Sequence, residues 1–470
     1  MSDSNSQVLW APCAWLNNAA GGVWARDVLL EIDASGYWSA ITSGVNSAQA
    51  ASANARILAG PLLPGLVNAH SHAFQRMFAA LAERRESEHD DFWSWRDRMY
   101  RVALAISPEQ LNAVATQLYI EMLRGGYTHV CEFHYLHHAP DGRAYDDPLT
   151  MTWMLIDAAR EAGIGLTVVP VLYERAGFNA LLLRDDQRRF ATDAAWIIAA
   201  QTRINASTSG SLVNSGVAIH SLRAARPESI RTLIANASGP IHIHVAEQTG
   251  EVDECVKTTG LRPVEWLLSH HALDARWQLI HATHVTEDEI ERVGKSGAAA
   301  VICPTTEANL GDGTTDIAAW LNAGTAISIG SDSHVTRDWR EELRLMEYGQ
   351  RLQHRARNIA ASPLTGQTAT AERLFSRVTT GGAAAAGQAL WGLTVGARAD
   401  ALVVDPSEPA LLGVPELRTL DAMVFSSPGQ PFANVLVAGR WVVRDGAHPA
   451  QKSAANAFAE AMREIWSGDT

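Results

Sequence analysis

Short apolar runs alternate with helix-length amphipathic segments between residues 62 and 385 of the chain. Eight of these runs have the length of buried strands and are bounded by turn signals. Helical patterns separate them, for example at 108–125, 151–163 and 286–297. Strands that alternate with helices favour a parallel sheet, and eight such units predict a (β/α)8 barrel of the TIM type, an α/β fold. The runs begin at Leu62, Thr128, Gly165, Gly216, Pro240, Trp277, Gly297 and Gly324.

Both ends of the chain carry a different pattern. Residues 1–61 hold short strand patterns such as WARDVLLEID, and strand patterns with Gly and Asp-Gly turns return from Leu390. We expect the two ends to build one small β-sandwich that the barrel interrupts, with a closing helix at 453–466. The predicted organisation is therefore a first sandwich part at 1–61, the barrel at 62–388, and a second sandwich part with the helix at 389–470.

Polar residues follow the apolar core of the predicted strands, at the face of such a barrel that carries the active site. The first strand, read as Leu62–Ala69, leads into His70-Ser71-His72. Residues two apart in a strand point to the same side, so these two imidazoles can converge, and such a pair suits a divalent metal such as zinc. Later strand ends offer Tyr135, His220, Arg223, His244, Glu247, His281 and Asp332.

The chain supplies the further ligands that a metal site needs. Two histidines, a third histidine and Asp332 make a four-ligand site with a position left for water. His242 and His244 can both face the same side, so spacing alone leaves the third histidine open. A bound metal lowers the pKa of its water towards roughly 7, and an adjacent Glu247 would carry a proton to the leaving group. His281 would stabilise the charge that develops on the attacking oxygen.

The order of these residues resembles the amidohydrolase superfamily. The segment GVAIHSLRA at the fourth strand has no lysine that could bridge two metals, and HVAE follows the fifth strand, so the pattern resembles the mononuclear deaminase branch. The resemblance implies a barrel within a split β-sandwich and one divalent ion per subunit, with zinc expected although iron or manganese can occupy similar sites. It implies that the metal ligands are His70, His72, His244 and Asp332, and that Glu247, His281 and Asp332 are catalytic.

Finer motifs resemble the formimidoylglutamate deiminases of histidine degradation. The resemblance implies hydrolysis of N-formimino-L-glutamate to N-formyl-L-glutamate and ammonia by a metal-bound hydroxide, in a homodimeric enzyme. A substrate with two carboxylates needs cationic partners, and a guanidinium grips a carboxylate bidentately. The motifs are NAHSHAFQR, FWSWRDRMY, EFHYLHH, AIHSLRA, HIHVAEQ and CPTTEANLGDG, and the implied substrate pocket consists of Gln75, Arg96, Tyr135, His220 and Arg223.

Some of these residues have simpler interpretations. Arg96 lies in an aromatic segment that packing alone explains, and Arg98 competes for the same role. The mixed-charge run 83–88 is either a solvated face or a lid over the pocket. Whether the segment 83–100 closes over substrate or forms an edge between subunits stays open.

Tyr135 and His220 also have alternatives. Tyr135 has three histidine neighbours that compete for its role: His134, His137 and His138. A lone His220 would be a hydrogen-bonded core residue, but Arg223 follows it by three residues at a strand end, which favours a functional role.

Composition and charge narrow the classes of partner and of cellular compartment. A chain of 470 residues can hold a large domain and a smaller one. The net charge of −13 and the lack of a clustered basic patch disfavour nucleic acids and anionic membranes as partners. Four separated cysteines without a CxxC motif suggest free thiols in a reducing compartment, and the first residues lack the pattern of a signal peptide. We expect a cytoplasmic enzyme whose partner is a small molecule with two carboxylates.

Two other functions compete with this interpretation. A deaminase or chlorohydrolase of the same branch could act on a nucleobase, a nucleoside or a triazine. Such planar rings call for stacking rather than paired arginines, so Arg223 and Tyr135 argue against it. A metal-free scaffold that binds partners would have lost a ligand or an acid, whereas all six inner positions of this chain are intact.

Overall fold

The computed structural model describes residues 6–18, 21–85, 92–208, 210–427 and 429–467. Its centre is a closed barrel of eight parallel strands in the order β10-β11-β12-β13-β14-β6-β7-β8, completed by pairing between β8 and β10, with the short β9 beside β8. The predicted (β/α)8 barrel is confirmed. The strands are β6 (Leu66–Ser71), β7 (Tyr127–His134), β8 (Gly165–Leu172), β9 (Val213–Ser215), β10 (Val217–Ile219), β11 (Ile241–Val245), β12 (Trp277–His281), β13 (Ala299–Ile302) and β14 (Ala326–Ile329).

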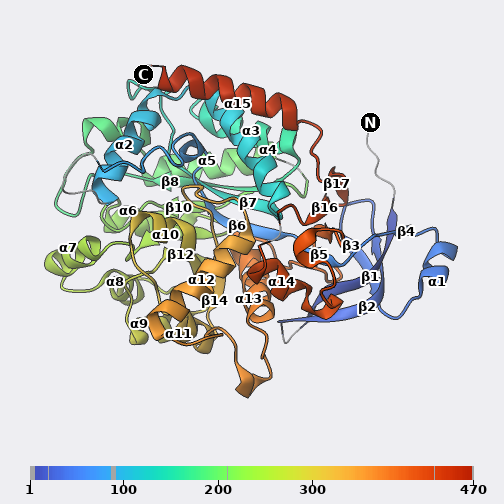
Figure 1. Ribbon diagram of the computed structural model, residues 1–470. Coiled ribbons are helices and arrows are strands. Elements are labelled where there is room, and N and C mark those ends of the chain that lie inside the picture. The colour runs from blue at the N-terminus through green and yellow to red at the C-terminus, as the bar shows by residue number, and fades with distance from the viewer. Residues whose placement is uncertain (1–5, 19–20, 86–91, 209, 428, 468–470) are drawn as a thin grey trace.

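Helices surround the barrel, as the alternating pattern predicts (Figure 1). Helix α3 begins with a capping box: the Ser107 hydroxyl accepts from the Gln110 backbone N–H, and the Gln110 side chain accepts from the Ser107 N–H. The helices are α2 (Phe92–Ala105), α3 (Pro108–Arg124), α4 (Thr150–Ala162), α5 (Ala194–Ser207), α6 (Pro227–Asn236), α7 (Thr249–Thr259), α8 (Pro263–His270), α9 (Glu287–Ser296), α10 (Pro304–Leu310), α11 (Ile317–Asn322), α12 (Trp339–His354) and α13 (Thr370–Ala385).

The end of α13 reaches the barrel interior on the side away from the strands' carboxyl ends. The Ala385 carbonyl accepts from Cys131 Sγ at 3.3 Å and from His242 Nε2 at 3.0 Å. The next carbonyl, that of Ala386, accepts from Thr167 Oγ1 at 3.0 Å. His242 is therefore a hydrogen-bonded core residue that lies one layer below His244 in the barrel.

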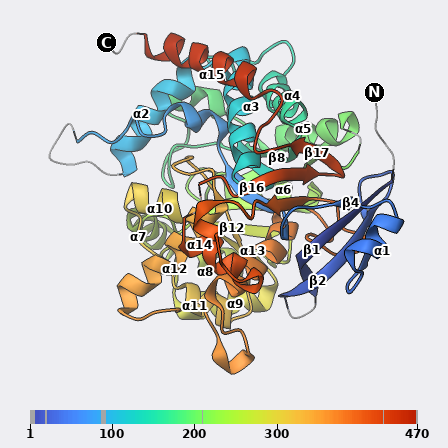
Figure 2. The ribbon, with the colours of Figure 1, turned by 45° about the vertical axis from the view of Figure 1, so that its right-hand side comes forward.

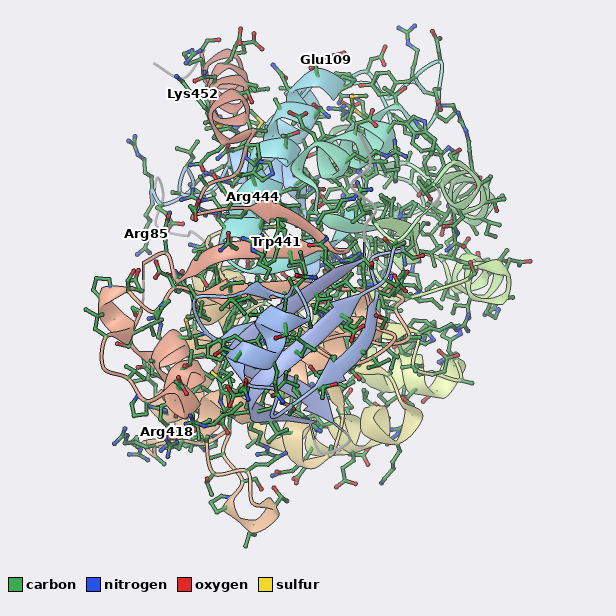
Figure 3. All side chains as sticks on the ribbon, turned by 90° about the vertical axis from the view of Figure 1, so that its right-hand side faces the viewer. Arg85, Glu109, Arg418, Trp441, Arg444 and Lys452 are labelled. Carbon is green, nitrogen blue, oxygen red and sulfur yellow. The ribbon has the colours of Figure 1, made fainter. Side chains whose placement is uncertain are left out.

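The two ends of the chain build a second sheet. Its strands run in the order β17-β16-β15-β5-β1-β2-β3, with β4 beside β1, and they enclose a separate apolar core. Figure 3 looks onto this sheet, with Trp441 of β17 beside the blue amino-terminal strands. The small domain from both termini is confirmed, as one continuous sheet. Its elements are β1 (Gln7–Asn18), β2 (Gly21–Ile32), β3 (Trp38–Thr42), α1 (Ser47–Ser52), β4 (Arg56–Ile57), β5 (Leu62–Pro64), β15 (Ala401–Val404), α14 (Thr419–Phe425), β16 (Phe432–Val437) and β17 (Arg440–Val443).

The segment Leu62–Ala69, expected as one strand, forms parts of two. Residues Leu62–Pro64 pair with β1 and β15 in the terminal sheet, whereas β6 begins at Leu66 in the barrel. Gly65 makes the passage possible, because a Cβ there would lie 2.3 Å from the Thr128 side chain. Its carbonyl accepts from Trp391 Nε1 at 2.7 Å.

The last helix, α15 (Gln451–Trp466), begins two residues before the predicted start and packs along α3 (Figures 1 and 2). Trp466 Nε1 donates to the Met77 carbonyl at 3.3 Å, which joins this helix to the barrel. All four cysteines are buried free thiols. Within the part of the chain that the structure describes, no helix has both the length and the apolar character needed to cross a membrane.

The buried His134 should make stability depend on pH. Burial lowers the pKa of its imidazole to about 3, and the Arg189 guanidinium acts in the same direction. The unfolded chain takes up this proton below about pH 6.5, so stability is lost as the pH falls through that value. We expect His134→Gln to reduce the slope of unfolding free energy against pH by about 1.4 kcal/mol per pH unit below about pH 6, measured by urea denaturation.

A matched control is His354→Gln at the exposed end of α12. This side chain is exposed, so the substitution replaces a histidine without touching a buried group, and this variant should keep the wild-type slope. Equal slopes for the wild type and His134→Gln would contradict the prediction.

Candidate active site

Three buried histidines converge at the carboxyl ends of β6 and β11. His70 Nε2 lies 3.0 Å from His244 Nε2, and the centroids of the His70 and His72 rings are 4.6 Å apart. His72 Nδ1 donates to the Phe133 carbonyl at 2.9 Å, which leaves its Nε2 for the cluster. Asp332 Oδ1 completes the group at 3.4 Å from Nε2 of both His70 and His72.

The donor set fits a divalent metal ion. Burial lowers the pKa of all three rings, that of His70 to about 3, so neutral imidazoles present nitrogen lone pairs to one point. Burial would raise the pKa of Asp332, but His70, His281 and His72 hold it below its ordinary value, so this group is a carboxylate. Converging neutral imidazoles and one carboxylate are the ligands of catalytic zinc sites that keep a position for water.

The pairing of β6 with β14 brings Asp332 beside His70 of β6 and His72, which directly follows this strand. The Asp332 N–H donates to the His70 carbonyl at 3.0 Å, and the His72 N–H donates to the Asp332 carbonyl at 3.3 Å. Gly330 permits this approach, because a Cβ there would lie 2.6 Å from the His70 Cβ. Asp332 has a φ of 45°, a left-handed conformation that Asp adopts more readily than most residues.

Two proton-carrying groups lie next to Asp332. His281 Nε2 is 3.7 Å from both Glu247 Oε1 and Asp332 Oδ2, and His281 Nδ1 is 3.3 Å from Glu307 Oε1. Burial alone would lower the pKa of His281, but Glu247, Glu307 and Asp332 raise it to about 10, so both ring nitrogens carry protons. Burial raises the pKa of Glu247 to about 7, which suits a group that takes up and returns a proton near neutral pH.

A pocket opens over this cluster. Gln75 Nε2 donates to the Tyr135 hydroxyl at 3.1 Å on its wall, and His220 Nδ1 lies 3.2 Å from Ser221 Oγ. Arg223 Nη1 is buried and has no hydrogen-bond partner among the described residues. The structure places all five residues expected to bind substrate on this wall: Gln75, Arg96, Tyr135, His220 and Arg223.

The competing residues point elsewhere. Arg98 Nη1 donates to the Ala82 carbonyl at 3.0 Å, whereas the Arg96 guanidinium lines the pocket and lies 4.6 Å from the Trp93 ring. His138 Nε2 bonds to the Ala191 carbonyl at 2.7 Å, and the His134 and His137 rings pack against each other outside the pocket lining. Of the mixed-charge run 83–88, residues 86–88 lie outside the described residues.

Several residues of the site were not predicted. Asp312 lies in CPTTEANLGDG and accepts from Gln248 Nε2, and its carboxylate shares a cluster with Glu247 and His281 in which the polar atoms lie within 4.8 Å of one another. Glu307 comes from the same motif. Its position in the first turn after β13 could have indicated it, because residues that follow a barrel strand line the active face. The other unpredicted residues are the acid Glu251 and the wall residues Phe92, Trp95, Met99, Tyr100, Tyr173, Phe190 and Leu310.

Comparison with known proteins supports one family. Residues 62–442 match the model of the amidohydrolase family. The chain is 44% identical to formimidoylglutamate deiminase of Pseudomonas aeruginosa, over 94% of this chain and 96% of that protein. It is 40% identical to a solved amidohydrolase from Brucella melitensis, with a TM-score of 0.90 over 98% and 99% of the two chains. The zinc complex of atrazine chlorohydrolase from Arthrobacter aurescens shares the fold at 18% identity, with a TM-score of 0.80 over 97% and 99%.

The family match covers the whole barrel and most of the carboxyl-terminal strands of the second sheet. The resemblance read from the motifs is confirmed at this level, and the barrel has the geometry that it implied. The chain belongs to the amidohydrolase family and is a hydrolase that acts on C–N bonds.

Proposed function

We propose that the enzyme hydrolyses N-formimino-L-glutamate to N-formyl-L-glutamate and ammonia. The observation that carries the proposal is Arg223, whose Nη1 is buried at the pocket without a hydrogen-bond partner among the described residues. A buried cationic donor without a hydrogen bond is costly, so the site favours a ligand that brings an anion to it. The 44% identity to formimidoylglutamate deiminase of Pseudomonas aeruginosa supports the same substrate.

A second arginine suits the second carboxylate of this substrate. Arg96 of α2 lines the same pocket, and its Nε is buried without a hydrogen-bond partner in the described part of the chain. The linked pair Gln75 and Tyr135 offers further polar contacts. The aromatic wall would also accept the planar rings of the alternative function. Such rings, however, would bring no anion to the nitrogens of Arg96 and Arg223 that lack a hydrogen bond.

Each residue of the site has its own role in the proposed reaction. His70, His72, His244 and Asp332 would hold one divalent ion, for which we propose zinc, and this ion when bound polarises water and lowers its pKa. Glu247 accepts a proton from the water that attacks the formimino carbon and delivers it to the nitrogen that leaves as ammonia. His281 donates from Nε2 to the charge that develops on the attacking oxygen, and Asp332 accepts the second proton of the water, which then passes to the same nitrogen so that it leaves as neutral ammonia.

We further propose that the enzyme is a cytoplasmic homodimer. The four buried free thiols fit a reducing compartment. The homodimer is supported by the family resemblance and by two exposed apolar side chains, Leu352 and Leu364, with exposed fractions of 81% and 102%. Light scattering of the purified protein distinguishes a dimer from a monomer.

Ammonia release from N-formimino-L-glutamate tests the proposed function directly. We expect release by the metal-loaded enzyme, loss of release on chelation and its return when Zn²⁺ is added. N-formimino-L-aspartate, guanine and adenosine serve as controls and should not release ammonia, because none places two carboxylates at the same spacing. Release from a ring substrate in place of N-formimino-L-glutamate would contradict the proposal.

Arg223→Met should damage substrate binding and leave the metal in place. Loss of a buried guanidinium–carboxylate pair costs about 2–5 kcal/mol, so kcat/KM should fall at least roughly thirty-fold, mainly through KM. Steady-state kinetics and metal analysis measure both effects. Arg231→Met on the exposed face of α6 is the matched control and should behave as the wild type. Wild-type kinetics in Arg223→Met would show that the pocket has been assigned wrongly.

His244→Asn and His242→Asn should separate the metal ligand from its neighbour. Zn²⁺ at about 100 times its Kd should stabilise the metal-free protein by about 2.7 kcal/mol, seen as a rise in Tm. His244→Asn should lose this rise, whereas His242→Asn should keep it, because His242 bonds to the Ala385 carbonyl deeper in the barrel. The opposite result would make His242 the ligand.

A further inference from the structure

Glu251 is a buried acid in the first turn of α7. Its side chain is 0% exposed, and it turns back toward the end of β11. Oε1 accepts from the Ala246 N–H at 3.3 Å, and Oε2 accepts from the Glu247 N–H at 3.1 Å. Ala246 has a φ of 53°, so the backbone that carries Glu247 is held in a left-handed conformation by this carboxylate.

The same carboxylate faces Arg223. Glu251 Oε2 lies 3.8 Å from Arg223 Nη1, which is an ion-pair distance but too long for a hydrogen bond. Burial lowers the pKa of Arg223, but the charge of Glu251 and, more weakly, that of Glu247 raise it. Glu251 therefore compensates part of the guanidinium charge while leaving the donors of Nη1 free.

We propose that Glu251 is a positioning residue that fixes Glu247 for proton transfer and limits the affinity of Arg223 for the substrate carboxylate. The inference rests on the proposed function, because it takes Arg223 as a carboxylate ligand. The two groups that it serves come from different strand ends, Arg223 after β10 and Glu247 after β11.

The limit on affinity has a physical reason. N-Formimino-L-glutamate and N-formyl-L-glutamate carry the same two carboxylates, so Arg223 attracts substrate and product alike. Binding that is equally strong before and after the reaction does not speed the chemical step, and a tightly held product leaves slowly. A second carboxylate beside Arg223 weakens both complexes and so favours product release.

The simpler alternative is that Glu251 only caps the segment before α7. Loss of such a cap would loosen the strand end and weaken binding of every ligand. The proposal predicts the opposite sign for binding, because removal of the Glu251 charge leaves Arg223 with a stronger attraction for the ligand carboxylate. The direction of the change in affinity therefore separates the two.

Glu251→Gln tests the proposal. Calorimetry with N-formyl-L-glutamate on the metal-loaded enzyme measures affinity without turnover. We expect the Kd to fall by roughly three- to ten-fold, since an opposing charge close to Arg223 is lost. In the same variant kcat should fall roughly ten-fold or more, because Glu247 loses part of its backbone support. An unchanged or raised Kd would overturn the proposal.

Two further variants complete the test. Asp253→Asn removes one charge from the exposed face of the same helix and should leave Kd and kcat at wild-type values. Glu251→Asp keeps the charge but shortens the side chain, so it should lower kcat without tightening product binding. If Glu251→Gln does not fold, judged by Tm, Glu251→Asp decides: a wild-type kcat in this variant overturns the proposal.

The failure of this inference differs from a failure of the proposed function. A wild-type enzyme that releases no ammonia from N-formimino-L-glutamate and binds no N-formyl-L-glutamate would overturn the function and this inference together. An active wild type with a Glu251→Gln variant that binds product no more tightly would overturn only the role given to Glu251.

Discussion

Closure of the barrel between β14 and β6 is the constraint on which the site depends. Asn68 Oδ1 accepts from the Ser331 N–H at 3.0 Å, and Asn68 Nδ2 donates to Ser331 Oγ at 2.7 Å, across 263 positions of the chain. His70 and Asp332 follow next along this contact between β6 and β14. A metal ion held by both would bind the first and last strands together, so metal binding and barrel closure stabilise each other. Backbone pairing between the β6 and β14 segments brings together residues that are far apart in the sequence. The positions of the proposed metal ligands follow from this pairing.

Backbone strain concentrates at the same rim of the barrel, where the carboxyl ends of its strands lie. Ala246, His281, Asp332 and His334 all have positive φ values, between 45° and 68°. Such conformations persist only where the surroundings fix them, and here hydrogen bonds do so. The Ala246 carbonyl accepts from the His284 N–H at 2.9 Å while Glu251 holds the Ala246 N–H, and His334 lies 3.0 Å from Ser331 Oγ through Nδ1. The rim is thus tied from strand to strand, and Glu247 and His281 are presented by a rigid frame rather than by free loops.

The sequence predicts what periodicity and strand ends control. Eight apolar runs predicted the barrel. Active-site residues of such barrels lie at the carboxyl ends of the strands, and this rule placed His70, His244 and Asp332 in one group. The passage at Gly65 was not predictable, because an apolar run such as Leu62–Ala69 does not say which sheet each half joins. Spacing could not separate His242 from His244, since both face inward and only depth in the barrel distinguishes them. Glu251 was missed for a similar reason: an acid in a first helical turn looks like a solvated cap until the fold turns it toward Arg223.

The charge of the pocket, rather than the barrel, is the basis of the proposed substrate selectivity. At 18% identity, atrazine chlorohydrolase shares this fold with a TM-score of 0.80 over nearly the whole chain, and a fold by itself does not select a substrate. Arg96 and Arg223 lie in a chain of net charge −13, and each has a buried nitrogen at the pocket without a hydrogen-bond partner among the described residues. A site built around buried polar groups rejects a ligand that cannot pair them far more strongly than an apolar wall rejects a ligand of the wrong shape. In the proposed function, two arginines on an aromatic wall would therefore turn a general hydrolytic centre into one selective for a dicarboxylate.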